Sequence, residues 1–197
     1  GSALNSGQVG SLRAALFIAR RYTGHPPQEK DFLALAHDQI AEKLAFAKSV
    51  IDPNLGNDTF LRESRNEIQE RMTACGAHIR EHHKIAEAIP KAWHLYRKLQ
   101  TDMRIPSCQE LPDAFKILDL SLTHALYLEA IGEYLDKKGQ SRGSYLVKNP
   151  EGKTPCPELG DDWKFLLNEQ DASVNKKILE ISLAVVITLS FMQILIN

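Results

Sequence analysis

The chain has 197 residues, of which 43% are hydrophobic and 25% charged, and its formal net charge is -1 at pH 7. These values are typical of a globular protein of one or two domains that buries its own apolar core. The nearly balanced charge, without a long basic run, argues against nucleic acid or an anionic membrane surface as a partner.

Two helices are expected at the start of the chain. Apolar residues recur at helical spacing over about 3–22, and Gly24 with the prolines after it ends that pattern. A second helix is expected from after Pro27 to about Val50, because residues 52–54 then break the periodicity into a loop.

Three more helices are expected over about 59–76, 81–100 and 111–138. Asp58 or Thr59 can cap the first of them, and Gly76 is expected to adopt a left-handed turn that reverses the chain into the next helix. Pro90 is expected to kink the second.

The character of the sequence changes after Gly139. Scattered glycines and prolines over 139–160 predict an irregular arm with little strand. The end of the chain, about 178–196, is almost uniformly apolar and is compatible with a strand pair, a buried helix or a marginal membrane span. Its uncharged run over 181–196 is shorter than the roughly 20 residues of a bilayer crossing, which argues against a membrane helix.

Cysteines and histidines give little sign of a metal site. The three cysteines are isolated, which fits reduced thiols of a cytosolic protein that are buried as small apolar residues: Cys75, Cys108 and Cys156. Three histidines lie close together, but no carboxylate or thiolate is placed to complete a ligand shell. We therefore expect solvated surface side chains and no metal at His78, His82 and His83.

The first fifteen residues, GSALNSGQVGSLRAA, combine small residues with a helix start. Gly1 and Ser2 can cap the helix, and Ser6, Gly7 and Gly10 leave its surface bare. A helix N-terminus presents unpaired N–H groups and a partial positive charge, so such a start suits a flat or anionic ligand. The other interpretation is a Gly-Ser expression tag before an ordinary packing helix.

This segment resembles the end of the flavin-binding domain in FAD-dependent oxidoreductases of the fumarate reductase, succinate dehydrogenase flavoprotein and L-aspartate oxidase superfamily. Residues 1–4 occupy the family's turn that opens a long helix, and residues 13–15 its Arg-Ala-Ala. The resemblance implies that FAD is the cofactor and that the residues at its pyrimidine edge are Gly1, Ser2, Ala3, Leu4, Asn5 and Ser6.

Two later segments resemble the same family. IQERMTACGAHIR, residues 68–80, is similar to a signature of its helical domain, and QSRGSYLV, residues 140–147, to a segment that follows its long third bundle helix. The second match departs from the family pattern, since Tyr145 stands where His is common. Arg142 and Tyr145 are the candidate substrate or interdomain residues, because a guanidinium can fork to a carboxylate or lock the arm against another domain.

The resemblance implies a mainly α fold. Residues 1–24 would be the last helix of an FAD-binding domain, 25–139 a spectrin-like three-helix bundle, and 140–197 an irregular arm with an apolar tail. The dinucleotide-binding loop GxGxxG and the family's catalytic residues are absent from the sequence, so no catalytic residue is assigned here.

The implied function is hydride transfer between a small organic acid and FAD. The implied partners are N-terminal FAD-binding and capping domains outside this chain and an iron–sulfur electron-transfer subunit. The expected location is the cytoplasm or, through such a partner, the inner face of a membrane. The alternative is a non-enzymatic helical-bundle interaction module that docks through its apolar tail.

Overall fold

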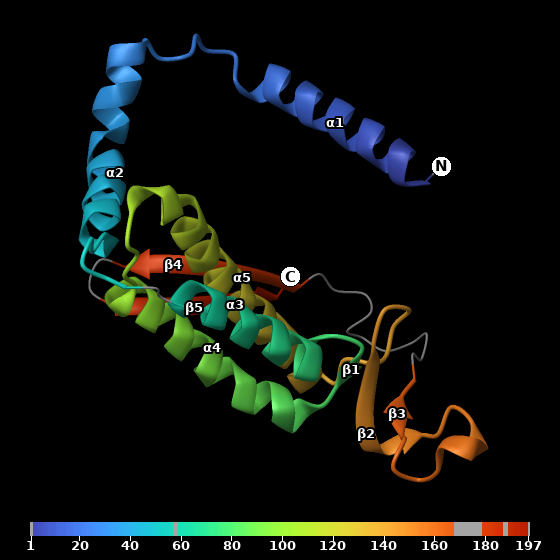
Figure 1. The fold of residues 1–197 in the computed structure, drawn as a ribbon. Helices are drawn as coiled ribbons and strands as arrows, with labels where there is room; N and C mark the ends of the chain where they lie inside the picture. Colours follow the sequence, from blue (N-terminus) through green and yellow to red (C-terminus); the bar gives the residue numbers. More distant parts are fainter. Residues whose placement is uncertain (1, 57–58, 168–178, 187–188, 197) are drawn as a thin grey trace. The chain divides into compact units, whose positions relative to one another are not determined.

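The protein, seen in a computed structural model, is mainly helical and carries a small three-stranded sheet (Figure 1). The structure describes residues 2–56, 59–167, 179–186 and 189–196. All five expected helices are present, as α1 (Ser2–Arg21), α2 (Glu29–Val50), α3 (Phe60–Arg71), α4 (His82–Asp102) and α5 (Leu111–Asp136).

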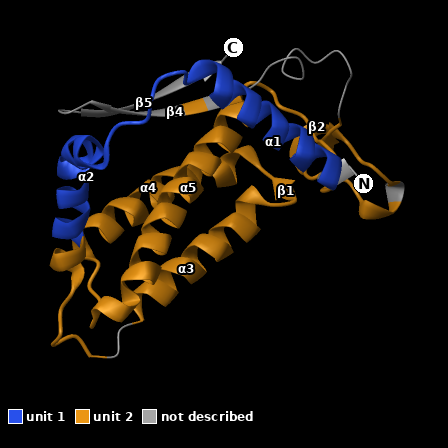
Figure 2. Cartoon of the chain, turned by 90° about the horizontal axis from the view of Figure 1, so that it is seen from above, with its two compact units in different colours: residues 1–46 blue, residues 47–197 orange. Residues whose placement is uncertain are grey.

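The chain divides into two compact units, Gly1–Phe46 and Ala47–Asn197 (Figure 2). The first holds α1 and most of α2. The last turn of α2 belongs to the second unit, where Val50 is buried and its carbonyl accepts a hydrogen bond of 2.8 Å from the amide of Ile105. The boundaries expected near residues 24 and 139 rest on the family resemblance and stay predictions.

The second unit is built on the pair α4 and α5. One stripe of α4 is buried, at Ile85, Ala88, Ala92, Leu95 and Leu99. It packs with the buried stripe of α5, which includes Ala125, Leu128, Ile131 and Leu135. These stripes recur every three or four residues, which is why the sequence located both helices. Pro90 lies inside α4, and the helix continues beyond it to Asp102.

The chain leaves α3 through a π-helical turn, η1 (Met72–Gly76). The expected left-handed conformation of Gly76 is wrong, because Gly160 is the glycine with a positive φ, 74°, among the described residues. The wide π turn already redirects the backbone, and Ala77 follows with φ -86° and ψ -120°. An added Cβ at Gly76 would lie 2.7 Å from the Met72 Cε atom, so the flexible end of the Met72 side chain would have to move.

The arm contains more strand than the sequence predicts. Its strands are β2 (Leu146–Lys153) and β3 (Phe165–Leu166), and β2 also pairs in parallel with β1 (Ile79–Arg80). The expectation of little strand is therefore wrong for the eight residues of β2. Their extension comes from partners distant in the sequence. Val147 joins the apolar core of the helices, and Phe165 is buried.

The apolar end of the chain forms an antiparallel strand pair, β4 (Leu179–Val186) and β5 (Leu189–Ile196). Of the three alternatives for this segment, the strand pair is the one present. Among the described residues, no helix combines the length and apolar character that a membrane crossing requires.

Candidate functional site

The first predicted site lies at the start of α1. Ser2 to Ser6 form its first turn, and Leu4, Asn5 and Ser6 are exposed. Gly1 lies outside the described residues. This first turn carries no acidic residue, whereas Arg20 and Arg21 occupy the last turn. The helix therefore keeps an uncompensated positive end, which favours a negatively charged group there.

A shallow recess of about 440 Å³ adjoins this turn and is lined by Leu4, Gly7, Gln8 and Ser11. Gly7 opens it, since no atom lies within 4 Å of the position that a Cβ would take. The Ser11 hydroxyl donates to the Gly7 carbonyl at 2.8 Å, so its hydrogen bond is made within the helix. The recess is bare and can accept a flat group or a closely packed backbone. The first turn and this recess thus present an exposed surface at the positive end of α1.

α1 carries six large apolar side chains among its 20 residues, and at about 100° per residue they point to several sides of the helix. Polar residues are interspersed with them around the helix: Asn5, Ser6, Gln8, Ser11, Arg13, Arg20 and Arg21. Large apolar side chains are normally buried. Yet the large apolar side chains of α1 are 45–69% exposed: Leu4, Val9, Leu12, Leu16, Phe17 and Ile18.

The second predicted site, in the other unit, is a tight turn that joins Arg142 to Tyr145. The Arg142 amide donates to the Tyr145 carbonyl at 2.9 Å, and the Tyr145 amide donates back at 3.1 Å. Arg142 is exposed and Tyr145 is half-buried. The two candidate residues are thus adjacent, with the guanidinium available to a partner and the phenol turned toward the fold.

Arg80 completes this second site and was assigned no role from the sequence. Its guanidinium carbon lies 3.7 Å from the centroid of the Tyr145 ring, and its Nε donates to the carbonyls of Gly76 and Ala77 at 3.2 and 3.3 Å. Burial lowers the pKa of Arg80 from its ordinary value. The 68–80 motif, which ends in Ile-Arg, could have pointed to Arg80 in the sequence. Its contact with the Tyr145 ring is seen only in the folded chain.

The Tyr145 phenol stays protonated near neutral pH. Burial, followed by its hydrogen bond with Tyr134, raises the pKa of Tyr145 to about 12. The Tyr134 hydroxyl donates to the Gln140 carbonyl at 2.8 Å and accepts from the Gln140 amide at 3.0 Å. Tyr145 thus stays protonated beside the Arg80 guanidinium and is unsuited to act as a general base.

A wider recess of about 740 Å³ lies between the start of α4 and the arm. The Lys148 ammonium lies 5.2 Å from the Trp163 ring centroid in its wall. His82 and His83 line this recess and are exposed, and His78 is also exposed but lies outside the recess. His82 Nε2 lies 2.5 Å from a carboxylate oxygen of Asp136. No group of three or more metal-ligating side chains gathers among the described residues.

The cysteines differ from one another in burial. Cys75 is buried as expected, and burial raises the pKa of its thiol, which makes it a poor nucleophile. The expectation of burial is wrong for Cys108, which is exposed on the short 3-10 turn η2 (Cys108–Glu110). This turn carries no buried residue, so nothing there demands an apolar side chain.

Comparisons with protein-family models, with curated proteins and with solved structures find no match.

Proposed function

We propose that this chain is the C-terminal part of an FAD-dependent oxidoreductase similar to the fumarate reductase and succinate dehydrogenase flavoproteins. In this proposal, residues 1–24 complete an FAD-binding domain, residues 25–139 form a spectrin-like bundle, and residues 140–197 are its arm and tail. FAD would accept or supply the hydride that is exchanged with a small organic acid. The groups that handle protons lie on other polypeptide, so this chain alone is inactive.

The observation that carries the proposal is the apolar surface of α1. Leucines and a phenylalanine are exposed on several sides of this 20-residue helix, which favours contact with other protein. The rest of an FAD-binding domain would supply that contact, whereas the alternative interaction module would dock through its apolar tail.

The start of α1 would contribute electrostatically. Backbone amides of residues 1–6 would face the pyrimidine edge of the flavin, and the positive end of the helix would stabilise the negative charge of the reduced ring. The absence of an acid from the first turn supports this assignment, because a carboxylate there would oppose that charge.

Arg142 would act across the domain boundary. It is exposed on a turn that Tyr145 and Arg80 hold in place, so its guanidinium is presented with little freedom of the backbone. It would pair with a carboxylate of the FAD-binding or capping domain, or with the acid substrate. An iron–sulfur subunit is the further partner that the resemblance implies.

The test is co-expression of residues 1–197 with a flavin-binding domain of this superfamily that ends before its last helix. We expect the two chains to purify together with bound yellow cofactor. Leu12→Asp and Phe17→Asp should abolish this association, because each places a charge on the apolar surface of α1. Arg13→Gln, at a polar position of the same helix, is the matched control and should associate. If the chain remains a well-folded monomer and never binds the flavin domain, the interaction-module alternative is favoured.

A second variant tests the role of the amides. Ala3→Pro removes one N–H from the first helical turn, where proline is tolerated. Losing one hydrogen bond to a charged group, about 1.5–3 kcal/mol, should lower the flavin midpoint potential by roughly 30–60 mV. A spectroelectrochemical titration measures this shift. An unchanged potential with normal cofactor content would remove α1 from the flavin site.

A further inference from the structure

A buried polar pair lies where α3 meets α5. His124 of α5 is 3% exposed, and neither of its ring nitrogens has a hydrogen-bond partner among the described residues. Nη1 of Arg71, on α3, is likewise buried and unpartnered within that part of the chain. Buried polar atoms normally have hydrogen-bond partners, so these unpartnered atoms carry a desolvation cost that nothing among the described residues offsets.

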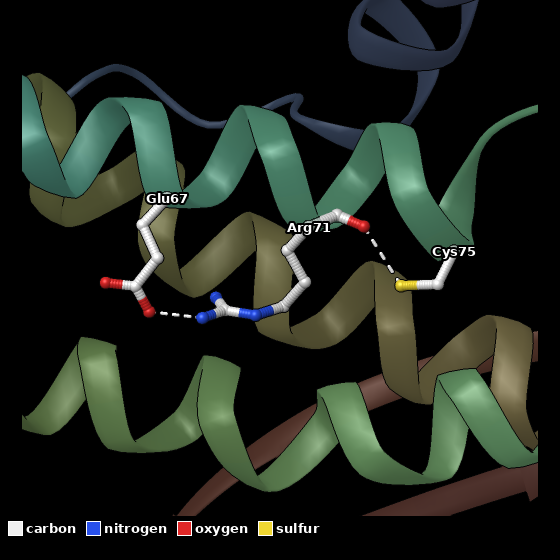
Figure 3. Close-up of polar contacts among 3 residues, drawn as sticks. All are labelled: Glu67, Arg71 and Cys75. Atoms are coloured by element: carbon white, nitrogen blue, oxygen red, sulfur yellow. Dashed lines mark hydrogen bonds and ion pairs between the residues drawn. The ribbon is translucent and has the colours of Figure 1, made fainter.

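Arg71 is held in this position by its own helix. Figure 3 shows its guanidinium turned back toward Glu67, one turn earlier, while the Cys75 thiol donates to its carbonyl at 2.9 Å. The Arg71 side chain is 11% exposed. A cation thus stays close to His124, with Glu67 as its partial counter-charge.

His124 must be neutral in this environment. Burial, followed by the charge of Arg71, lowers the pKa of His124 to about 4, against a smaller opposing effect of Glu67. From η1, the nearby Cys75 thiol is neutral, and α4 turns an apolar stripe toward α5. A proton on His124 would therefore lie in an apolar contact beside an existing cation.

Of the three helices, α3 is held least firmly. It buries only Ser64 and Ile68 among its residues, whereas α4 and α5 bury long stripes against each other. A recess of about 390 Å³ separates α3 and η1 from α4, lined partly by the charged Glu67, Arg71, Lys84, Glu87 and Lys91. Local opening takes place first where few apolar contacts would be lost.

We propose that α3 is an acid-released element of the fold. Protonation of His124 expels residues 60–71 from α5, while α4 and α5 stay packed and His124 gains access to water. This device is independent of the proposed flavoprotein function, since it depends only on contacts within the second unit.

Hydrogen exchange on the full chain tests the proposal. The folded pKa is lowered, so the open form binds more protons and opening becomes more favourable as the pH falls from about 6.5 toward 4. Between pH 7.5 and 5.0, the opening constant of the α3 amides should rise about 25-fold after correction for intrinsic exchange rates. The buried amides of α4 and α5 should keep their protection. Loss of protection in all three helices together would overturn the proposal.

Variants identify the group that responds. His124→Leu cannot take up a proton and should abolish the pH response of α3, and His124→Gln serves the same purpose if the leucine variant does not fold. His94→Gln, at an exposed position of α4, is the matched control and should retain the response. A 25-fold response that survives in the His124 variants contradicts the proposal. So does an NMR titration of the wild-type chain in which the His124 imidazole protonates near its ordinary pKa.

Discussion

At the scale of single residues, the two arginines around Tyr145 have opposite environments. Arg80 is half-buried, contacts the Tyr145 ring and donates to two backbone carbonyls. Arg142 is exposed at the other end of the same turn. The Arg80 guanidinium makes its contacts within the fold, so we expect Arg80 to contribute to stability. The Arg142 side chain is exposed, so we expect it to contribute to association with a partner.

Replacement of each arginine measures this division. Arg80→Ala should lower the free energy of unfolding by about 1–3 kcal/mol, because the stacking and two hydrogen bonds are lost. Arg142→Ala should stay within about 0.5 kcal/mol of the wild type. Urea denaturation gives both values. If both variants lost the same free energy of unfolding, Arg80 and Arg142 would not differ in their contribution to stability.

Lys138 offers a second prediction at this scale. It lies two residues beyond the end of α5 and has φ at 61°, a left-handed conformation that costs a residue with a side chain about 1 kcal/mol relative to glycine. Lys138→Gly should therefore raise the free energy of unfolding by up to about 1 kcal/mol, despite the greater freedom of the unfolded chain. Thermal denaturation monitored by circular dichroism is the measurement, with Lys137→Gly, which has φ at -79°, as a control that should be destabilised.

At the scale of elements, two glycines mark close approaches of different kinds. A Cβ on Gly132 of α5 would lie 2.9 Å from Cδ1 of Ile89, the free end of a flexible side chain. A Cβ on Gly152 of β2 would lie 2.4 Å from backbone atoms of Phe165. The helix pair can adjust a side chain, whereas β2 and β3 cannot separate without losing their pairing.

Alanine at the two positions should therefore act differently. Gly132→Ala should change the free energy of unfolding by less than about 1 kcal/mol, because the gain in helix propensity offsets the shift of Ile89. Gly152→Ala should cost about 1–3 kcal/mol and open the β2–β3 pairing. Trp163, whose ring centroid lies 6.2 Å from that of Phe165, reports this opening by its fluorescence. A Gly152 variant with native fluorescence and stability would contradict the close approach.

At the scale of the whole molecule, the two units differ in how they are stabilised. The second has an apolar core shared by helices and sheet, with Val147 and Ile85 in one cluster. In the first unit, the described side chains of both helices are largely exposed. Residues 47–197 should thus fold without the first unit, which needs other protein to bury its apolar side chains.

Separate expression of the two units checks this difference. Residues 47–197 should unfold cooperatively, with a midpoint within about 5 °C of the full chain, because the cluster around α4 and α5 is intact. Residues 1–46 should show little helix alone, since isolated helices are marginal in water. Circular dichroism distinguishes the outcomes. Stable helix in the first unit alone would weaken the inference that α1 is inserted into another domain.

The sequence by itself determined the five helices, because apolar residues recur at three- and four-residue intervals and this spacing is visible within a single segment. Only the tertiary structure decided the strand at 146–153, the contact of Arg80 with Tyr145 and the burial of His124 beside Arg71. Each of these depends on pairing between segments far apart in the chain, which local periodicity does not record.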